Sequence, residues 1–265
     1  MASLRILLLA AAIAGLSWFQ FLNTASAREV GRDAVDLFDP RPANEILFIG
    51  TSRMSTNDLP AMVRAVADSA DAPVKYQVRT WAPGGHSLID HVKNETVRRL
   101  LAQRRDRVIL QAQSREQMDE RMRADFANYG RRLVGLAREA GSPSSLIVNW
   151  TYGEELFRDY PGMRDEAHSV IQADHRALAR ESGADLVNVG RVWKQVEDAR
   201  PGLALTTDGN HPSVAGTYVY ALMVYAHLSG ADVRGVRYVP DGVSEAEARV
   251  LRELIADYLA SAVDA

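Results

Sequence analysis

The chain has 265 residues, of which 47% are hydrophobic and 25% charged, and its formal net charge is -3. These values are ordinary for a folded globular protein and argue against intrinsic disorder. The slightly acidic balance offers no basic face for phosphate groups, so no nucleic-acid partner is expected. Cysteine is absent, which excludes disulfides, a thiol nucleophile and thiolate metal sites. The fold must therefore be held together by its own hydrophobic core.

Residues 1–27 have the pattern of an export signal. A short basic start precedes an apolar run over 6–16, and Ala-Ser-Ala at 25–27 supplies the small-x-small cleavage pattern. We therefore expect an exported protein, periplasmic or secreted, with one domain over residues 28–265 and no membrane insertion after cleavage. The alternative is an uncleaved membrane anchor, because residues 18–22 prolong the apolar stretch to near spanning length.

Beyond a polar lead-in, short apolar runs alternate with segments of helical spacing. The patterns predict strands at 45–50, 74–82, 107–113, 144–152 and 184–190, and helices at 58–70, 87–104, 116–140, 164–182, 191–199, up to 229 and at 244–262. Strands that alternate with helices imply a parallel sheet covered on both faces. The fold class is therefore predicted to be α/β, a three-layer α/β/α sandwich around a five-stranded parallel sheet. Ligands of such folds bind beyond the carboxyl ends of the strands.

Candidate functional residues follow the first two predicted strands directly. Ser52 lies between a strand and a helix, where its hydroxyl can stand at the sheet edge and its N–H can face an oxyanion. Gly84 and Gly85 follow the second strand, where a glycine lets a substrate approach the backbone and offers an N–H donor. Taken singly, each segment is better explained as an ordinary turn, because Gly and Ser are common turn residues.

Two further segments complete the candidate site. Gln111 and Gln113 end the third strand, where a buried amide must be hydrogen-bonded; one could face an oxyanion, or both could satisfy loop carbonyls. Asp208 and His211 precede the helix that ends at 229, so a carboxylate can bond one imidazole nitrogen while the other takes a proton from a serine. The alternative is an Asp-Gly turn with a capping histidine. Together the segments fall where the fold predicts an active site.

The blocks FIGTSR, PGGHSL and DGNHP, in this order, resemble those of the SGNH/GDSL hydrolase family. The resemblance covers most of the chain after the export signal and implies a flavodoxin-like SGNH hydrolase fold. It implies no metal and no organic cofactor. It assigns a nucleophile, a base and an orienting carboxylate to Ser52, His211 and Asp208, and an oxyanion hole to Ser52, Gly85 (with Gly84 as the alternate) and Gln113.

Two positions depart from the family pattern. Thr51 stands where the family has aspartate before the serine, and the asparagine that usually follows the third strand is missing. Counting from the strand puts Gln113 in its place. Glutamine keeps the amide donor but adds a methylene, so the oxyanion hole must be reshaped or completed by Gln111.

The resemblance implies an exported serine ester hydrolase that works through an acyl-enzyme on Ser52. The expected substrates are small-molecule or glycan esters, with small acyl groups such as acetyl removed from carbohydrate. Two alternatives stay open: an O-acyltransferase on the same site, and an inactive glycan-binding module, which Thr51 and the missing asparagine favour. Candidate substrate-binding residues are Arg53, Gly84, Gln111, Trp81 and Trp150.

Overall fold

Five short apolar segments form the strands that the sequence predicts. In the computed structural model, which describes residues 39–117, 120–158 and 162–263, they are β1 (Ala43–Ile49), β2 (Lys75–Trp81), β3 (Arg107–Gln111), β4 (Ser144–Ile147) and β5 (Asp185–Val187). All neighbouring strands pair in parallel, in the order β2-β1-β3-β4-β5. This is the flavodoxin-like order, so the predicted fold class is confirmed.

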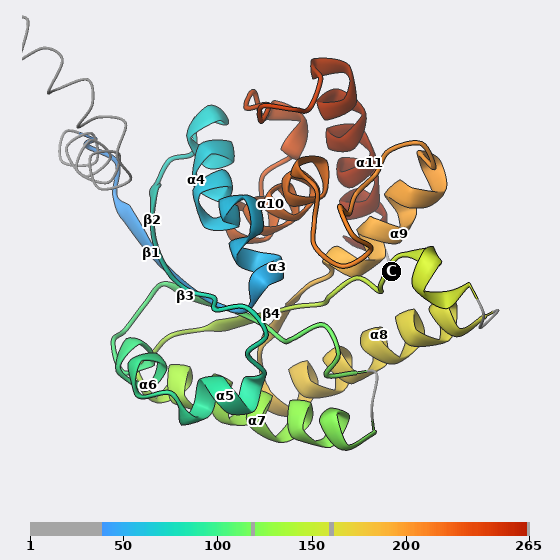
Figure 1. The fold of residues 1–265 in the computed structure, drawn as a ribbon. Helices are drawn as coiled ribbons and strands as arrows, with labels where there is room; N and C mark the ends of the chain where they lie inside the picture. The colour runs from blue at the N-terminus through green and yellow to red at the C-terminus, as the bar shows by residue number, and fades with distance from the viewer. Residues whose placement is uncertain (1–38, 118–119, 159–161, 264–265) are drawn as a thin grey trace, which may run out of the picture. The chain divides into compact units, whose positions relative to one another are not determined.

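Helices cover both faces of the sheet, which makes three layers (Figure 1). One face carries α4 (Leu59–Ser69), α9 (Val189–Ala199), α10 (Val214–Ser229) and α11 (Glu245–Val263), and the other carries α5 (Leu88–Lys93), α6 (Glu95–Leu101), α7 (Glu120–Glu139) and α8 (Met163–Ser182). Short pieces complete the chain: α3 (Ser52–Ser55) and the 3-10 turns η1 (Thr56–Asp58), η2 (Glu154–Phe157) and η3 (Val233–Gly235).

Residues 43–265 form one compact unit, and the fold above is that of its described part. The predicted export signal lies outside the described residues. None of the described helices is long and apolar enough to cross a membrane.

The structure differs from the predicted elements at their ends. The helix expected over 87–104 is two helices, because Asn94 takes an extended backbone and its side chain accepts the Val97 N–H at 3.2 Å to cap α6. The strands end earlier than the apolar runs that predict them, β3 at Gln111 and β4 at Ile147. The residues that follow turn away from the ladder at its carboxyl edge, which is where the candidate site lies.

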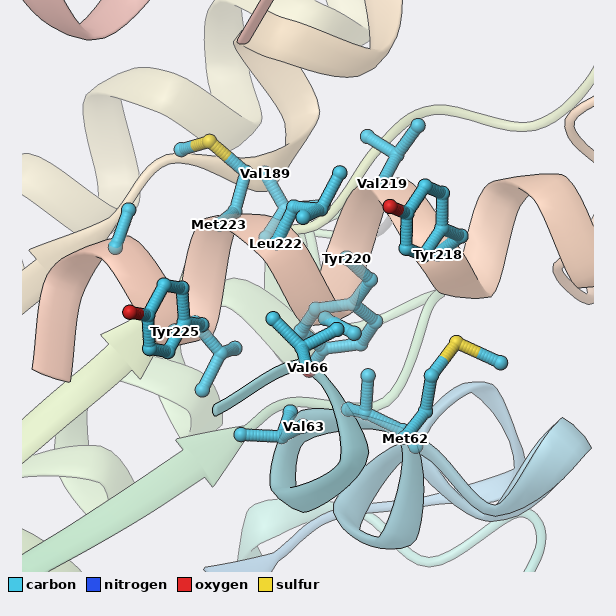
Figure 2. Packing of buried hydrophobic residues seen from close by; sticks show 14 of the residues in the cluster. Met62, Val63, Val66, Val189, Tyr218, Val219, Tyr220, Leu222, Met223 and Tyr225 are labelled. Carbon is cyan, nitrogen blue, oxygen red and sulfur yellow. The ribbon is translucent and has the colours of Figure 1, made fainter. Parts of the chain in front are cut away.

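Helix α10 is the centre of the larger apolar layer. Its sequence is apolar on every side, and the side chains from Ala215 to Ala226 are all buried. In Figure 2, Val63 and Val66 of α4 lie near Tyr220 and Tyr225 of α10. Because α10 is fixed by this packing, the loop that immediately precedes it is fixed as well.

The start of α10 allows a direct test of this packing. A Cβ at Gly216 would lie 2.1 Å from the carbonyl oxygen of Leu205 and 2.5 Å from the ring of Trp193. We expect Gly216→Ala to lower the free energy of unfolding by about 1–3 kcal/mol, because a rigid backbone has to move. Chemical denaturation followed by circular dichroism measures the change.

The matched control is Gly135→Ala, in the interior of α7, where a Cβ would meet nothing within 4 Å. This change should leave stability unchanged or raise it by about 0.5–1 kcal/mol, because alanine is the better helix former. If both variants gave the same free energy of unfolding, the tight approach of α10 to Leu205 would be disproved.

Candidate active site

The segment DGNHP forms a closed turn directly before α10. The carboxylate oxygen Oδ1 of Asp208 accepts the backbone N–H groups of Asn210 at 2.9 Å and His211 at 2.7 Å. The Thr207 N–H donates to the carbonyl of His211 at 2.9 Å, which closes the turn from the other side. Gly209 has a φ of 75°, a left-handed conformation that favours glycine. The turn therefore holds Asp208 and His211 in a defined relative position.

Ser52 is the first residue of α3, just past the carboxyl end of β1. Gly50 ends the strand where there is little room for a side chain, because a Cβ there would lie only 2.9 Å from the side chain of Met54. Thr51 precedes the helix in an extended conformation, and the Thr56 hydroxyl donates to the Ser52 carbonyl at 2.6 Å. The strand-to-helix bend brings the Ser52 hydroxyl to the edge of the sheet.

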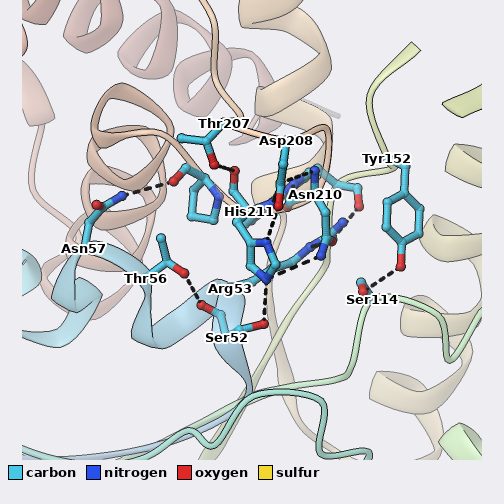
Figure 3. Close-up of polar contacts among 12 residues, drawn as sticks. Ser52, Arg53, Thr56, Asn57, Ser114, Tyr152, Thr207, Asp208, Asn210 and His211 are labelled. Atoms are coloured by element: carbon cyan, nitrogen blue, oxygen red, sulfur yellow. Dashed lines mark hydrogen bonds and ion pairs between the residues drawn. The ribbon is translucent and has the colours of Figure 1, made fainter. Parts of the chain in front are cut away.

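The structure brings Ser52, His211 and Asp208 together in one line of hydrogen bonds (Figure 3). The Nε2 atom of His211 lies 2.9 Å from the Ser52 hydroxyl, and its Nδ1 lies 2.7 Å from Oδ2 of Asp208. An ionised carboxylate has no proton to give, so Nδ1 carries the proton and donates it to Asp208. Nε2 is then unprotonated and able to accept the hydroxyl proton of Ser52. The arrangement can generate a serine nucleophile.

Asp208 is held in its ionised form. The hydrogen bond from the His211 side chain, followed by the N–H of His211, lowers the pKa of Asp208 to about 2. The carboxylate therefore stays charged wherever a neutral imidazole exists. A charged partner fixes the tautomer of His211 and would stabilise the imidazolium that forms on proton transfer.

Arg53, the neighbour of Ser52, bonds the turn of residues 207–211, which we call the histidine loop. Its Nε donates to Oδ1 of Asn210 at 3.0 Å, and its Nη1 donates to the carbonyl of Trp150 at 2.8 Å. The guanidinium also lies over the indole of Trp150, 4.5 Å from the ring centroid. Only 1% of Arg53 is exposed, and burial lowers its pKa to about 10. Packing encloses the side chain, and the prediction that Arg53 contacts substrate stays a prediction.

Trp150 is also a core residue, against the prediction that it lines a sugar pocket. It is 1% exposed and stacks on Trp193 with ring centroids 4.0 Å apart. Its indole N–H donates to the carbonyl of Asn210 at 3.2 Å, so it supports the histidine loop from below. Trp81 is half-buried at the end of β2 and packs against the apolar cluster beneath α5 and α6. A contact between Trp81 and a sugar stays a prediction.

The glycine pair lies beside the nucleophile. A Cβ at Gly84 would be 3.7 Å from the Cβ of Ser52, whereas one at Gly85 would meet nothing within 4 Å. Gly85 has a φ of 76° and turns the chain toward α5. Gly84, the alternate in the sequence prediction, is thus the glycine in contact with Ser52. The assignment of an oxyanion donor to the Gly85 N–H stays a prediction.

The two glutamines at the end of β3 take different positions: Gln111 is its last residue and Gln113 lies just beyond it. Gln113 is largely buried, and its side-chain oxygen accepts the Arg115 N–H at 2.7 Å. The assignment of an oxyanion donor to its Nε2 stays a prediction. Gln111 is fully buried and donates Nε2 to Oδ1 of Asn149 at 3.2 Å. One N–H of the Gln111 amide is thus used inside the protein, and the prediction that Gln111 contacts substrate or completes the oxyanion hole stays a prediction.

The sequence interpretation missed three residues that form hydrogen bonds at or beside the candidate site. Asn210 lies inside the DGNHP block, but only the fold shows that its side-chain oxygen accepts a hydrogen bond from Arg53. Ser114 and Tyr152 follow β3 and β4, and their hydroxyls are hydrogen-bonded at 2.8 Å beside the site (Figure 3). Their places at the ends of neighbouring strands were a usable signal. Among the described residues, no group of three or more His, Cys, Asp or Glu side chains could hold a metal ion.

No protein-family model matches the chain, and no curated protein matches it. Solved structures do. One is a candidate SGNH hydrolase from Slackia heliotrinireducens, at 26% identity and a TM-score of 0.58, covering 70% of this chain and 99% of that one. A DUF4886 family protein from Bacteroides uniformis has 16% identity and a TM-score of 0.67, with coverages of 82% and 95%. The acetylxylan esterase Axe2 from Geobacillus stearothermophilus has 18% identity and a TM-score of 0.59, with coverages of 75% and 99%.

The last two similarities, at such low identity, concern the fold alone. Together with the first they confirm the resemblance expected from the sequence blocks. The chain therefore has the fold of the SGNH/GDSL hydrolases, and its Ser52, His211 and Asp208 side chains form the hydrogen-bonded line of a serine hydrolase.

The charge on Asp208 gives a prediction that needs no substrate. In an NMR titration of the side-chain carboxyl carbons, Asp208 should titrate near the value of about 2 set by His211, and His211→Ala should raise its pKa toward 3.8. Since the pKa is depressed in the folded state, the stabilisation from Asp208 is present above the unfolded pKa and lost as pH falls through the folded one.

Asp232 serves as the internal reference. Its pKa is also lowered, but by hydrogen bonds from Arg234, so His211→Ala should leave it unchanged. An Asp208 pKa that stayed the same in the variant would mean that the two side chains are not bonded in solution.

Proposed function

We propose that the protein is an esterase that hydrolyses carboxylic esters through a covalent acyl-enzyme on Ser52. The observation that carries the proposal is the continuous line from the Ser52 hydroxyl to His211 Nε2 at 2.9 Å and from Nδ1 to Asp208 at 2.7 Å. A turn without catalytic function would not need a histidine bonded at both ring nitrogens to residues so far apart in the chain. Serine, base and carboxylate in this order of contacts make a nucleophile.

In the first step, Nε2 of His211 takes the hydroxyl proton of Ser52 while Oγ forms a bond to the carbonyl carbon of the ester. The electron pair of the carbonyl moves to its oxygen. When the intermediate collapses, the bond to the alcohol oxygen breaks and the imidazolium gives that oxygen its proton. Water then attacks the acyl-Ser52 in the same way, with His211 again as the base, and releases the acid and the free serine.

The developing oxyanion needs donors on the far side of the carbonyl. We assign this role to the backbone N–H groups of Ser52 and of the Gly84-Gly85 pair and to Nε2 of Gln113. Three facts support the assignment: a Cβ at Gly84 would touch Ser52, the helix α3 starts at Ser52, and Gln113 follows the neighbouring strand β3. Loss of one such donor typically removes about 3–4 kcal/mol of transition-state stabilisation.

Exposure of the site favours hydrolysis over transfer to a second alcohol. The side chain of His211 is 33% exposed and that of Asp208 is 53% exposed. A transferase must keep water away from its acyl-enzyme, whereas an esterase needs water beside the general base. The acyltransferase alternative therefore has less support.

The substrates that we propose are esters with small acyl groups, acetyl in particular, on carbohydrate or other small alcohols. Support comes from the acetylxylan esterase among the proteins of similar fold, and from the export pattern of residues 1–27, which would bring the enzyme to glycans outside the cytoplasm. The protein is accordingly proposed to be periplasmic or secreted.

The nucleophile can be tested with p-nitrophenyl acetate and purified residues 28–265. Ser52→Ala and His211→Ala should each lower kcat by about 10^4-fold or more, because triad members act as a unit. Ser55→Ala is the matched control, since Ser55 lies on the same short helix with an exposed side chain. It should retain the parent rate, and circular dichroism should show all three variants folded.

A serine-reactive phosphonate probe gives an independent reading. The parent and Ser55→Ala should be labelled at Ser52, whereas Ser52→Ala should not be labelled. Equal background rates in all proteins together with no labelling would contradict the proposal and point to a glycan-binding module. Product that forms only when a sugar acceptor is added would instead point to acyl transfer.

A further inference from the structure

A buried carboxyl group outside the triad has no part in the chemistry above. Glu116 lies in the turn after β3, where its N–H donates to the carbonyl of Gln113 at 3.1 Å, and only 1% of the residue is exposed. Glutamate is rarely buried to this degree unless it is paired or fully hydrogen-bonded. The contacts of its side chain therefore indicate what it does.

Glu116 links the two loops to which the oxyanion hole is assigned. Its Oε1 accepts the backbone N–H of Leu88 at 3.0 Å, and Leu88 is the first residue of α5, directly after the loop with Gly84 and Gly85. Its Oε2 accepts the backbone N–H of Gln113 at 2.7 Å. One carboxylate thus spans loops that follow strands β2 and β3, which are not neighbours in the sheet.

An ionised carboxylate is the side chain suited to this position. Both of its oxygens accept hydrogen bonds, whereas a glutamine would present an NH2 group to one of the two N–H donors. A buried N–H that loses its acceptor costs the free energy of its desolvation, so the loop would shift to find another partner. Replacing one oxygen by NH2 should therefore separate the loops with almost no change in shape.

We infer that Glu116 is a positioning residue, which sets the distance between the Gly84-Gly85 loop and Gln113 and so keeps the oxyanion donors aligned on Ser52. The inference rests on the proposed esterase function. Glu116 itself contacts no reacting atom. Its effect should appear in kcat, because the donors act on the transition state rather than on the bound ester.

The charge state of Glu116 gives the inference a distinctive signature. Burial raises its pKa to about 7, against the two N–H bonds that lower it, and the carboxylates of Asp90 on α5 and Asp125 on α7 raise it further. The other shifted groups of α5 titrate well below this range: the pKa of Asp90 is lowered, and burial lowers that of His91 to about 4. Protonated Glu116 cannot accept both bonds, so the alignment should weaken as pH falls through about 7.

The experiment compares the parent with Glu116→Gln over a range of pH, with p-nitrophenyl acetate as substrate. Near about pH 8, kcat should fall on the order of 10- to 100-fold in the variant, with a smaller change in KM. The ratio of parent to variant kcat should shrink toward about pH 6, because the parent then loses the same contact.

Asp174→Asn is the matched control. The two oxygens of Asp174 also accept two N–H donors, both from Arg123, and they join α8 to α7 without bonding either of the loops that Glu116 joins. Its kcat should equal that of the parent at every pH, even if its melting temperature falls. A merely structural role for Glu116 would give a ratio of kcat values that does not change with pH.

A second measurement on the parent protein does not depend on whether the variant folds. In NMR spectra, the backbone amide protons of Leu88 and Gln113 should shift together with one common midpoint near about pH 7. Separate midpoints, or no shift, would overturn the inference, as would an unchanged kcat in Glu116→Gln or a ratio that is constant with pH. A parent protein with no esterase activity would overturn the proposed function and this role with it.

Discussion

The active site depends on one buried cation. The guanidinium of Arg53 comes from the residue next to the nucleophile, and it bonds Asn210, next to the histidine, 157 positions later in the chain. A planar group with several fixed donors can hold two partners at once, and here it also bonds the carbonyl of Trp150, whose indole it covers. Any movement of α3 relative to the histidine loop would break these bonds, so serine and base are held at a constant separation.

The apolar cluster around α4, α9, α10 and α11 packs against this arrangement. Trp150 lies between Arg53 and Trp193, and its N–H supports the same loop through the carbonyl of Asn210. Helix α10 starts just beyond the loop and is buried on all sides. His211 is therefore held in place from behind, although its side chain is one-third exposed to water.

The opposite side of the site is built differently. The loops after β2 and β3 carry the glycine pair and Gln113, and the carboxylate of Glu116 joins them. This chain also departs from the SGNH/GDSL pattern here, since it lacks the usual asparagine. A longer amide at Gln113 needs a defined loop spacing, which the Glu116 bridge would supply. The proposed activity should therefore depend on pH and on substitution at Glu116 through the spacing of these two loops.

The fold class, and the meeting of Ser52, Asp208 and His211 at the edge of the sheet, could be predicted from the sequence alone. Apolar runs alternating with helical spacing predict a parallel sheet, and Ser52 and the Asp208–His211 block fall where such sheets bind ligands. These features are local, so periodicity and turn chemistry are enough to reveal them. Which of the candidate side chains are buried could be learned only from the tertiary structure. Arg53, Gln111 and Trp150 lie at or just beyond the ends of strands, as Ser52 does, but burial depends on packing against α10, Asn149 and Trp193, which are distant in the chain.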